Sequence, residues 1–186
     1  MGTISLALHV TAAAILVGPQ ILMFLAVVPA TWLIEDDERL KRTITRVVAG
    51  RFGMLATLAI VTLIVTGLYQ YYTIVPVNVR EAPSEYVFGP IFTLKMLMFV
   101  ITMVLIGVHM RYYGKRIATL SDQVIAAQDD PFAKSVDEIA ALKDELERVR
   151  HKSFGFSVLI LGASLLTMWL GVALGHEAFA WGQLNP

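Results

Sequence analysis

Long stretches without a charged side chain are the feature that most restricts how this chain can fold. Residues 1–34, 52–79 and 153–176 contain no Asp, Glu, Lys or Arg, and residues 86–110 contain only Lys95. Stretches of 18 or more apolar residues match the hydrocarbon thickness of a bilayer, about 30 Å. The chain has 186 residues, of which 56% are hydrophobic. We therefore expect a multi-pass protein in contact with the lipid bilayer, without a separate soluble domain.

The apolar stretches predict four membrane spans, at about residues 4–31, 52–74, 88–112 and 153–176. Each span is expected to be helical, because lipid offers no partner to an unpaired backbone group. The sequence thus indicates an all-α integral membrane four-helix bundle. We expect residues 1–186 to form a single membrane domain.

The basic residues predict the orientation of these spans. Segments 35–51 and 111–152 hold thirteen of the fifteen Lys and Arg residues. Loops rich in Lys and Arg remain in the cytoplasm, so both segments are expected there and both chain termini outside. We interpret 35–51 as a loop between the first two spans.

Residues 113–150 are predicted to form a helical hairpin rather than an irregular loop. Apolar residues recur there at helical spacing, both before and after the "QDDP" sequence at 128–131. Asp130 followed by Pro131 is typical of a helix start. The hairpin would extend spans three and four by about 20 residues each, about 30 Å, into the cytoplasm. It is a candidate surface for a partner subunit or a second copy of the chain.

Composition excludes several kinds of site. The chain has no cysteine, so it has no disulfide framework, Fe–S cluster, covalently attached haem or thiolate nucleophile. Lys and Arg balance Asp and Glu, fifteen to fifteen, which gives no reason to expect a nucleic acid partner. No phosphate-binding loop or zinc motif is present.

Lys95 is the charged residue that lies away from the ends of the spans. A lysine at such a depth costs roughly 2.5 to 3.5 kcal/mol unless something compensates. Two explanations stay open. The ammonium can reach the outer interface, about 10 Å away, or it can face the bundle interior and contact a cofactor or substrate.

The four histidines lie near the ends of the predicted spans. His9 and His176 are expected near the outer side, and His109 and His151 near the inner side. His109 follows Lys95 by 14 residues, within about 40° of the same helix face and about 21 Å further along. Neutral imidazole between apolar helices can ligate haem iron. An interfacial role without a ligand is the alternative for each histidine.

Two further features bear on cofactors. Met96, Met103 and Met110 recur at heptad spacing on span three, and thioethers suit Cu(I), although core packing is the commoner role of methionine. Arg80 lies in the outer connection between spans two and three. It can pair with a carboxylate of a bound cofactor, such as a haem propionate, or be a solvated loop residue.

Three stretches resemble the copper-resistance D (CopD)-like membrane family. "LHVTAAAILVG", "RFGMLATLAIVTLIVTGLY" and "FGPIFTLKMLMF" resemble that family's first, second and third spans. The four-span HemJ-type protoporphyrinogen oxidases, which bind haem b, are related to the same superfamily. In them a histidine of the first span and a lysine of the third are implicated in the haem site. The resemblance places these roles on His9 and Lys95, while Leu16 stands where both groups tend to have tryptophan.

These observations favour a membrane haem b protein for electron transfer. The expected metal ligands are His9 and Lys95, and the expected cofactor-binding residues also include His109 and Arg80. A quinone, a partner subunit or a porphyrinogen remains open as electron partner, and so does enzymatic oxidoreductase activity. The alternatives are a copper-handling protein and a structural subunit that docks a partner through residues 113–150. We expect the bacterial inner (plasma) membrane as the location.

Overall fold

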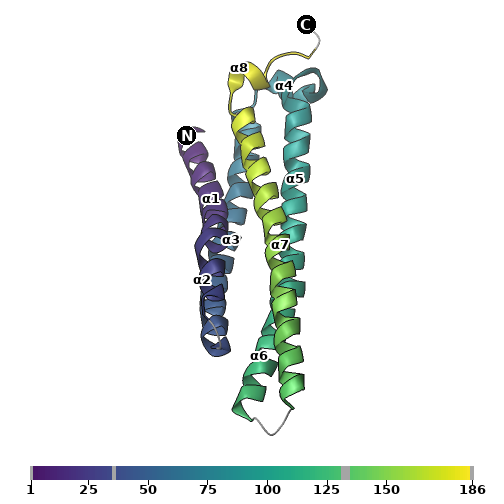
Figure 1. Cartoon of the computed structure of the whole chain (residues 1–186). Coiled ribbons are helices and arrows are strands. Elements are labelled where there is room, and N and C mark those ends of the chain that lie inside the picture. Colours follow the sequence, from purple (N-terminus) through teal and green to yellow (C-terminus); the bar gives the residue numbers. More distant parts are fainter. Residues whose placement is uncertain (1, 35–36, 131–134, 185–186) are drawn as a thin grey trace. The chain divides into compact units, whose positions relative to one another are not determined.

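The computed structural model describes residues 2–34, 37–130 and 135–184, and these residues form helices and one isolated β-bridge. Four helical stretches are long and apolar enough to cross a membrane, in agreement with the predicted membrane bundle (Figure 1). They are Gly2–Trp32, Glu38–Thr73, Phe88–Asp129 and Val136–Leu174.

The outward side chains of these stretches are apolar. Leu58, Trp169 and Val172, for example, have exposed fractions of 65%, 67% and 64%. In water, so much exposed apolar surface would be unfavourable, whereas lipid accommodates it without cost. The structure is therefore that of a multi-pass membrane protein.

The first stretch consists of α1 (Gly2–Leu22), a π-helical turn η1 (Met23–Val27) and α2 (Val28–Trp32). The second stretch is the single helix α3 (Glu38–Thr73). The interpretation of 35–51 as a loop was wrong, because α3 already includes residues 38–51. The side chain of Asp37 accepts a hydrogen bond from the Leu40 amide over 2.9 Å and so caps the helix start.

The third stretch consists of α5 (Phe88–Val108), a π-helical segment η3 (His109–Gly114) and α6 (Lys115–Asp129). The fourth is α7 (Val136–Leu174). The third and fourth helices thus continue beyond their apolar parts and form the predicted hairpin, with α6 beside the first part of α7 (Figure 1). The hairpin has a hydrophobic core of its own, composed of Leu120, Val124 and Leu146 with Ile117, Leu142 and Val149 around them.

The second hairpin helix begins later than its sequence suggested. Asp130 ends α6 instead of starting the next helix, and Pro131 lies outside the described residues. Ser135 caps α7: its hydroxyl accepts from the Glu138 amide over 3.3 Å, and the Glu138 carboxylate accepts from the Ser135 amide over 2.9 Å. This reciprocal pair is a capping box, which satisfies two backbone donors at the helix start.

Short elements connect α3 to α5 and follow α7. The connection contains α4 (Val77–Glu81) and the 3₁₀ turn η2 (Pro83–Glu85), and α8 (Glu177–Ala180) follows α7. Figure 1 shows α8 beside α4. The Val87 amide donates to the Gly182 carbonyl over 3.0 Å, and the Leu184 amide to the Glu85 carbonyl over 2.9 Å. These bonds attach the last described residues to the connection.

Contacts divide the chain into two compact units, and each contains a part of every long helix. The first unit, which we call the terminal unit, comprises residues 1–20, 53–103 and 161–186 and contains both chain ends. The second, the hairpin unit, comprises residues 21–52 and 104–160.

Candidate functional site

His9 is held in the terminal unit by a hydrogen bond to the second long helix. Its Nδ1 lies 2.8 Å from the Thr66 hydroxyl, and Thr66 is only 6% exposed. The imidazole also packs against Gly67, where a Cβ would lie 3.5 Å from His9 Cε1. α1 and α3 thus fix both the position and the plane of the ring.

The bonds of Thr66 determine which nitrogen of His9 carries the proton. The Thr66 hydroxyl donates its one hydrogen to the Thr62 carbonyl over 2.6 Å. It can therefore only accept from His9, so Nδ1 carries the hydrogen in this bond. The lone pair of the neutral imidazole is then on Nε2. An imidazole oriented in this way through its other nitrogen is typical of a metal ligand.

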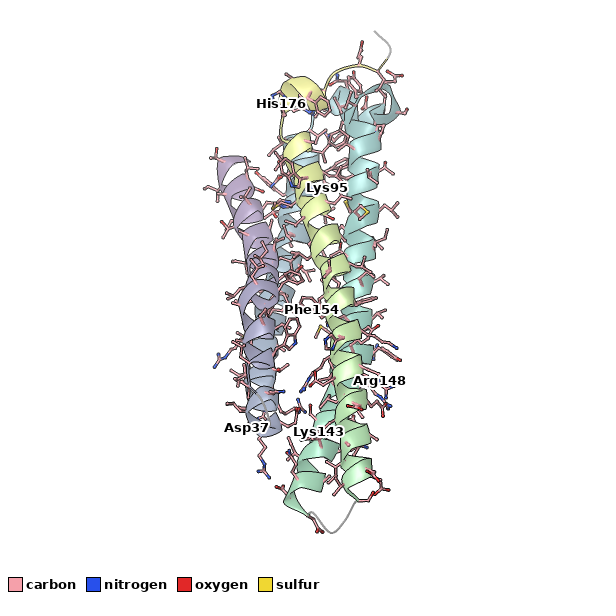
Figure 2. All side chains as sticks on the ribbon, in the orientation of Figure 1. Asp37, Lys95, Lys143, Arg148, Phe154 and His176 are labelled. Carbon is pink, nitrogen blue, oxygen red and sulfur yellow. The ribbon has the colours of Figure 1, made fainter. Side chains whose placement is uncertain are left out.

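Lys95 on α5 is half-buried and directed toward α7 (Figure 2). A Cβ on Gly171 would lie 3.4 Å from the Lys95 Nζ, so the ammonium approaches the backbone of α7. Gly171 is in the last turn of that helix, which ends at Leu174. The negative end of the helix dipole favours a cation there.

No carboxylate of the described residues lies within ion-pair distance of Lys95. Both predicted metal ligands thus lie in the terminal unit, His9 against α3 and Lys95 against α7. A cation without a carboxylate partner is an environment that favours an anionic or electron-rich ligand.

Arg80 lies elsewhere in the terminal unit, on α4. Its guanidinium carbon is 5.9 Å from the centre of the Tyr72 ring, a cation–π contact. Its Nε is buried and has no hydrogen-bond partner among the described residues. The side chain is therefore packed against an aromatic ring, and one of its donors is available to a carboxylate.

His109 lies in the hairpin unit, in the π-helical segment η3. Its Nε2 is 3.2 Å from the Ser153 hydroxyl and 3.5 Å from the Ser157 hydroxyl. Two aromatic rings, Tyr113 and Phe156, meet the imidazole edge-on. Because serine hydroxyls already engage Nε2, only Nδ1 is left for a further ligand.

The other two histidines have different surroundings. His151 is exposed in the hairpin unit, where its ring is parallel to the Trp32 ring with 6.1 Å between the centres. Its Nδ1 lies 2.9 Å from the Glu147 carbonyl. His176 is exposed and follows the end of α7.

A buried ion-pair network in the hairpin unit was not predicted. Arg150 donates to Glu38 over 2.6 Å and to Glu147 over 2.7 Å, and the Arg150 and Glu38 side chains are 17% and 7% exposed. Burial opposes the charge of Arg150, but the hydrogen bonds and charges of the two glutamates outweigh it and raise its pKa. Arg150 is therefore permanently charged. Arg42 pairs with Asp122 nearby on the same unit, over 3.2 Å.

The sequence did not predict that Thr66 would contact His9 or that Ser153 would contact His109. Nothing near Thr66 in the sequence points to His9, which is 57 residues away. The useful signal is the adjacent Gly67, since a small residue beside a hydroxyl allows a ring to approach a helix closely.

No family model, curated protein or solved structure matches this chain. Among the residues that the structure describes, no group of three or more His, Cys, Asp or Glu is placed to hold a metal ion.

Proposed function

We propose that the protein is a membrane haem b protein that transfers electrons, with His9 as an axial ligand. The observation that carries the proposal is the hydrogen-bond chain from His9 to Thr66 and on to Thr62. This chain leaves the Nε2 lone pair of His9 available in the terminal unit. Haem requires only one or two such side chains, so a cluster of three or more ligands is unnecessary.

The residues of the terminal unit fit a haem by their donor chemistry. His9 would bind the iron through Nε2. Lys95 would hold the group either through the iron, as a neutral amine, or through a propionate, as an ammonium. Gly67 and Gly171 let the two side chains approach α3 and α7 closely, because a Cβ on either glycine would be in van der Waals contact with His9 or with Lys95. Arg80, with a buried unpaired donor, is a further candidate for a propionate.

Bound haem would supply a one-electron couple between ferrous and ferric iron. The protein would contribute the rest. Thr66 would hold the His9 ring in one orientation and strengthen its basicity. The apolar helices would exclude water. As an ammonium, Lys95 would also raise the reduction potential by favouring the reduced, less positive iron.

We further propose the N-out/C-out orientation in the bacterial inner membrane, with the hairpin in the cytoplasm. The basic residues of α3 and of the hairpin support this orientation. His9 and Lys95 would then lie toward the outer leaflet. A quinone is the proposed electron partner in the membrane, and a porphyrinogen is the substrate implied by the HemJ resemblance.

A copper route has less support from the geometry. Met96 and Met110 have exposed fractions of 43% and 61%, so two of the three heptad methionines point away from their own helix bundle. A structural role as a docking subunit has no specific contact in its favour, because the hairpin covers its own apolar core. We therefore retain haem binding as the one proposed function.

The test is a reduced-minus-oxidised absorption spectrum of the full chain, purified in detergent from haem-replete cells. We expect a b-type band in the wild type and a loss of at least about 90% of haem per protein in His9→Ala, since an axial ligand is removed. His176→Ala is the matched control, because His176 is exposed, and it should keep the wild-type band.

Two results would contradict this function. One is a wild-type protein without any b-type band. The other is an equal loss of haem in His9→Ala and His176→Ala, which would indicate a general effect on folding.

A further inference from the structure

Three cations of the hairpin unit lie at the points where an uncharged part of a long helix begins or ends. They are Arg51, Arg111 and Lys152, next to the uncharged residues 52–79, 96–110 and 153–176. All three residues are exposed. We call them the interfacial cations, because the end of an apolar span is where the hydrocarbon of a bilayer gives way to its headgroups.

Contacts between α3 and α6 place the first two interfacial cations at one level. Arg42 on α3 pairs with Asp122 on α6 over 3.2 Å. Toward the apolar residues, Arg51 is nine residues from Arg42, about 14 Å, and Arg111 is eleven residues from Asp122, about 17 Å. The levels of Arg51 and Arg111 therefore agree within about 3 Å.

Lys152 lies at the same level on α7. It precedes Ser153, whose hydroxyl is 3.2 Å from His109 Nε2, and Arg111 follows His109 by two residues. Tyr112, beside Arg111, has an exposed fraction of 66%, and tyrosine is common at membrane interfaces. The three cations thus mark one surface of the bilayer.

The interfacial cations have no carboxylate partner in the parts of the chain that the structure describes. Carboxylates of the same unit pair instead with four other cations, namely Arg39, Arg42, Arg116 and Arg150. A negative partner for the interfacial cations is therefore left to the surroundings. Phospholipid phosphates lie at the depth where an apolar span ends.

We propose that the interfacial cations bind the phosphate groups of anionic phospholipids in the leaflet next to the hairpin. A guanidinium can pair with phosphate through two parallel hydrogen bonds, and an ammonium binds it as a point charge. A zwitterionic headgroup also carries a positive charge, which repels these cations. The surface should therefore prefer an anionic lipid, and it does not depend on haem.

Native mass spectrometry of the full chain, stripped of lipid in detergent, tests this preference. The probes are dioleoyl phosphatidylglycerol, which is anionic, and dioleoyl phosphatidylcholine, which is zwitterionic. We expect the wild type to bind the anionic lipid at least about tenfold more tightly, since each cation contributes roughly fivefold. R51Q/R111Q/K152Q should lose this preference.

The matched control is R39Q/R42Q/R116Q, which removes as many positive charges from the same unit but takes them from ion pairs. Surface ion pairs contribute little to stability, so this variant should fold and keep the wild-type preference. R51K/R111K keeps both charges and should keep the preference too.

Three results would overturn the proposal. The first is a wild type without preference for the anionic lipid, and the second is an equal preference in the wild type and R51Q/R111Q/K152Q. The third is an equal loss in R39Q/R42Q/R116Q or in R51K/R111K, because the position and charge of the interfacial cations would then not determine binding.

Discussion

The terminal unit and the hairpin unit differ in whether a buried cation has a carboxylate partner. In the hairpin unit Arg150 is paired with two carboxylates, so the network is electrically satisfied within the protein. In the terminal unit Lys95 has no carboxylate partner among the described residues and lies beside the last turn of α7. The difference indicates that the first charge serves the structure, whereas the second is available to a ligand.

Removal of Arg150 tests the structural half of this comparison and has the largest expected effect. Arg150→Ala would leave Glu38, 7% exposed, as an uncompensated charge. We expect a loss of about 3 to 5 kcal/mol in the free energy of unfolding. Thermal unfolding or titration with SDS in mixed micelles would measure it.

Lys95→Met is the matched variant in the terminal unit. Because no carboxylate depends on Lys95, this substitution should leave the stability of haem-free protein unchanged or increase it. A loss for Lys95→Met as large as that for Arg150→Ala would mean that the two charges have the same role, and the comparison would then be wrong.

A glycine in the first turn of α5 tests whether the terminal unit depends on close packing. A Cβ on Gly89 would clash with the Pro83 carbonyl oxygen, so Gly89→Ala must displace backbone. We expect a loss of about 1 to 3 kcal/mol in the free energy of unfolding, as overpacking usually causes. The same unfolding titration would measure it.

Gly107→Ala is the control for this substitution. A Cβ there would meet nothing within 4 Å, and alanine has a higher helix propensity than glycine by about 1 kcal/mol. Gly107→Ala should therefore be neutral or stabilising. Equal losses at the two glycines would show that the close contact at Gly89 is not what limits the substitution.

The sequence predicted the architecture well because lipid restricts a chain to few solutions. The uncharged stretches gave all four long helices, and helical spacing gave the hairpin around Leu120 and Leu146. The prediction of a loop over the basic segment 35–51 was wrong because Arg and Lys are good helix formers, so a charged segment can still be helical. The spacing of Ser135 and Glu138 matches a capping box, and the structure has the cap there and not at Asp130.

The candidate site could be predicted only in part. The depths of His9 and Lys95 in the membrane follow from counting residues along apolar helices, so the sequence could indicate both as candidate ligands. Their partners depend on the rotation of one helix against another, which apolar periodicity does not determine when every face is apolar. For this reason the sequence could not predict the hydrogen bonds from His9 to Thr66 and from Arg150 to Glu38.

The hydroxyl of Thr66 provides the finest test of the comparison, because it changes the ligand site without changing any charge. Thr66→Val keeps the shape of the side chain and removes the acceptor of the His9 Nδ1 hydrogen. If His9 holds haem, affinity for haem should fall roughly tenfold, the lower range for an outer-shell partner of a metal ligand. Thr66→Ser restores the hydroxyl and should restore affinity, which titration of haem into the apoprotein would measure. Equal haem affinities of Thr66→Val and the wild type would mean that Thr66 does not orient the imidazole for a metal. The terminal unit would then no longer differ from the hairpin unit as a candidate ligand site.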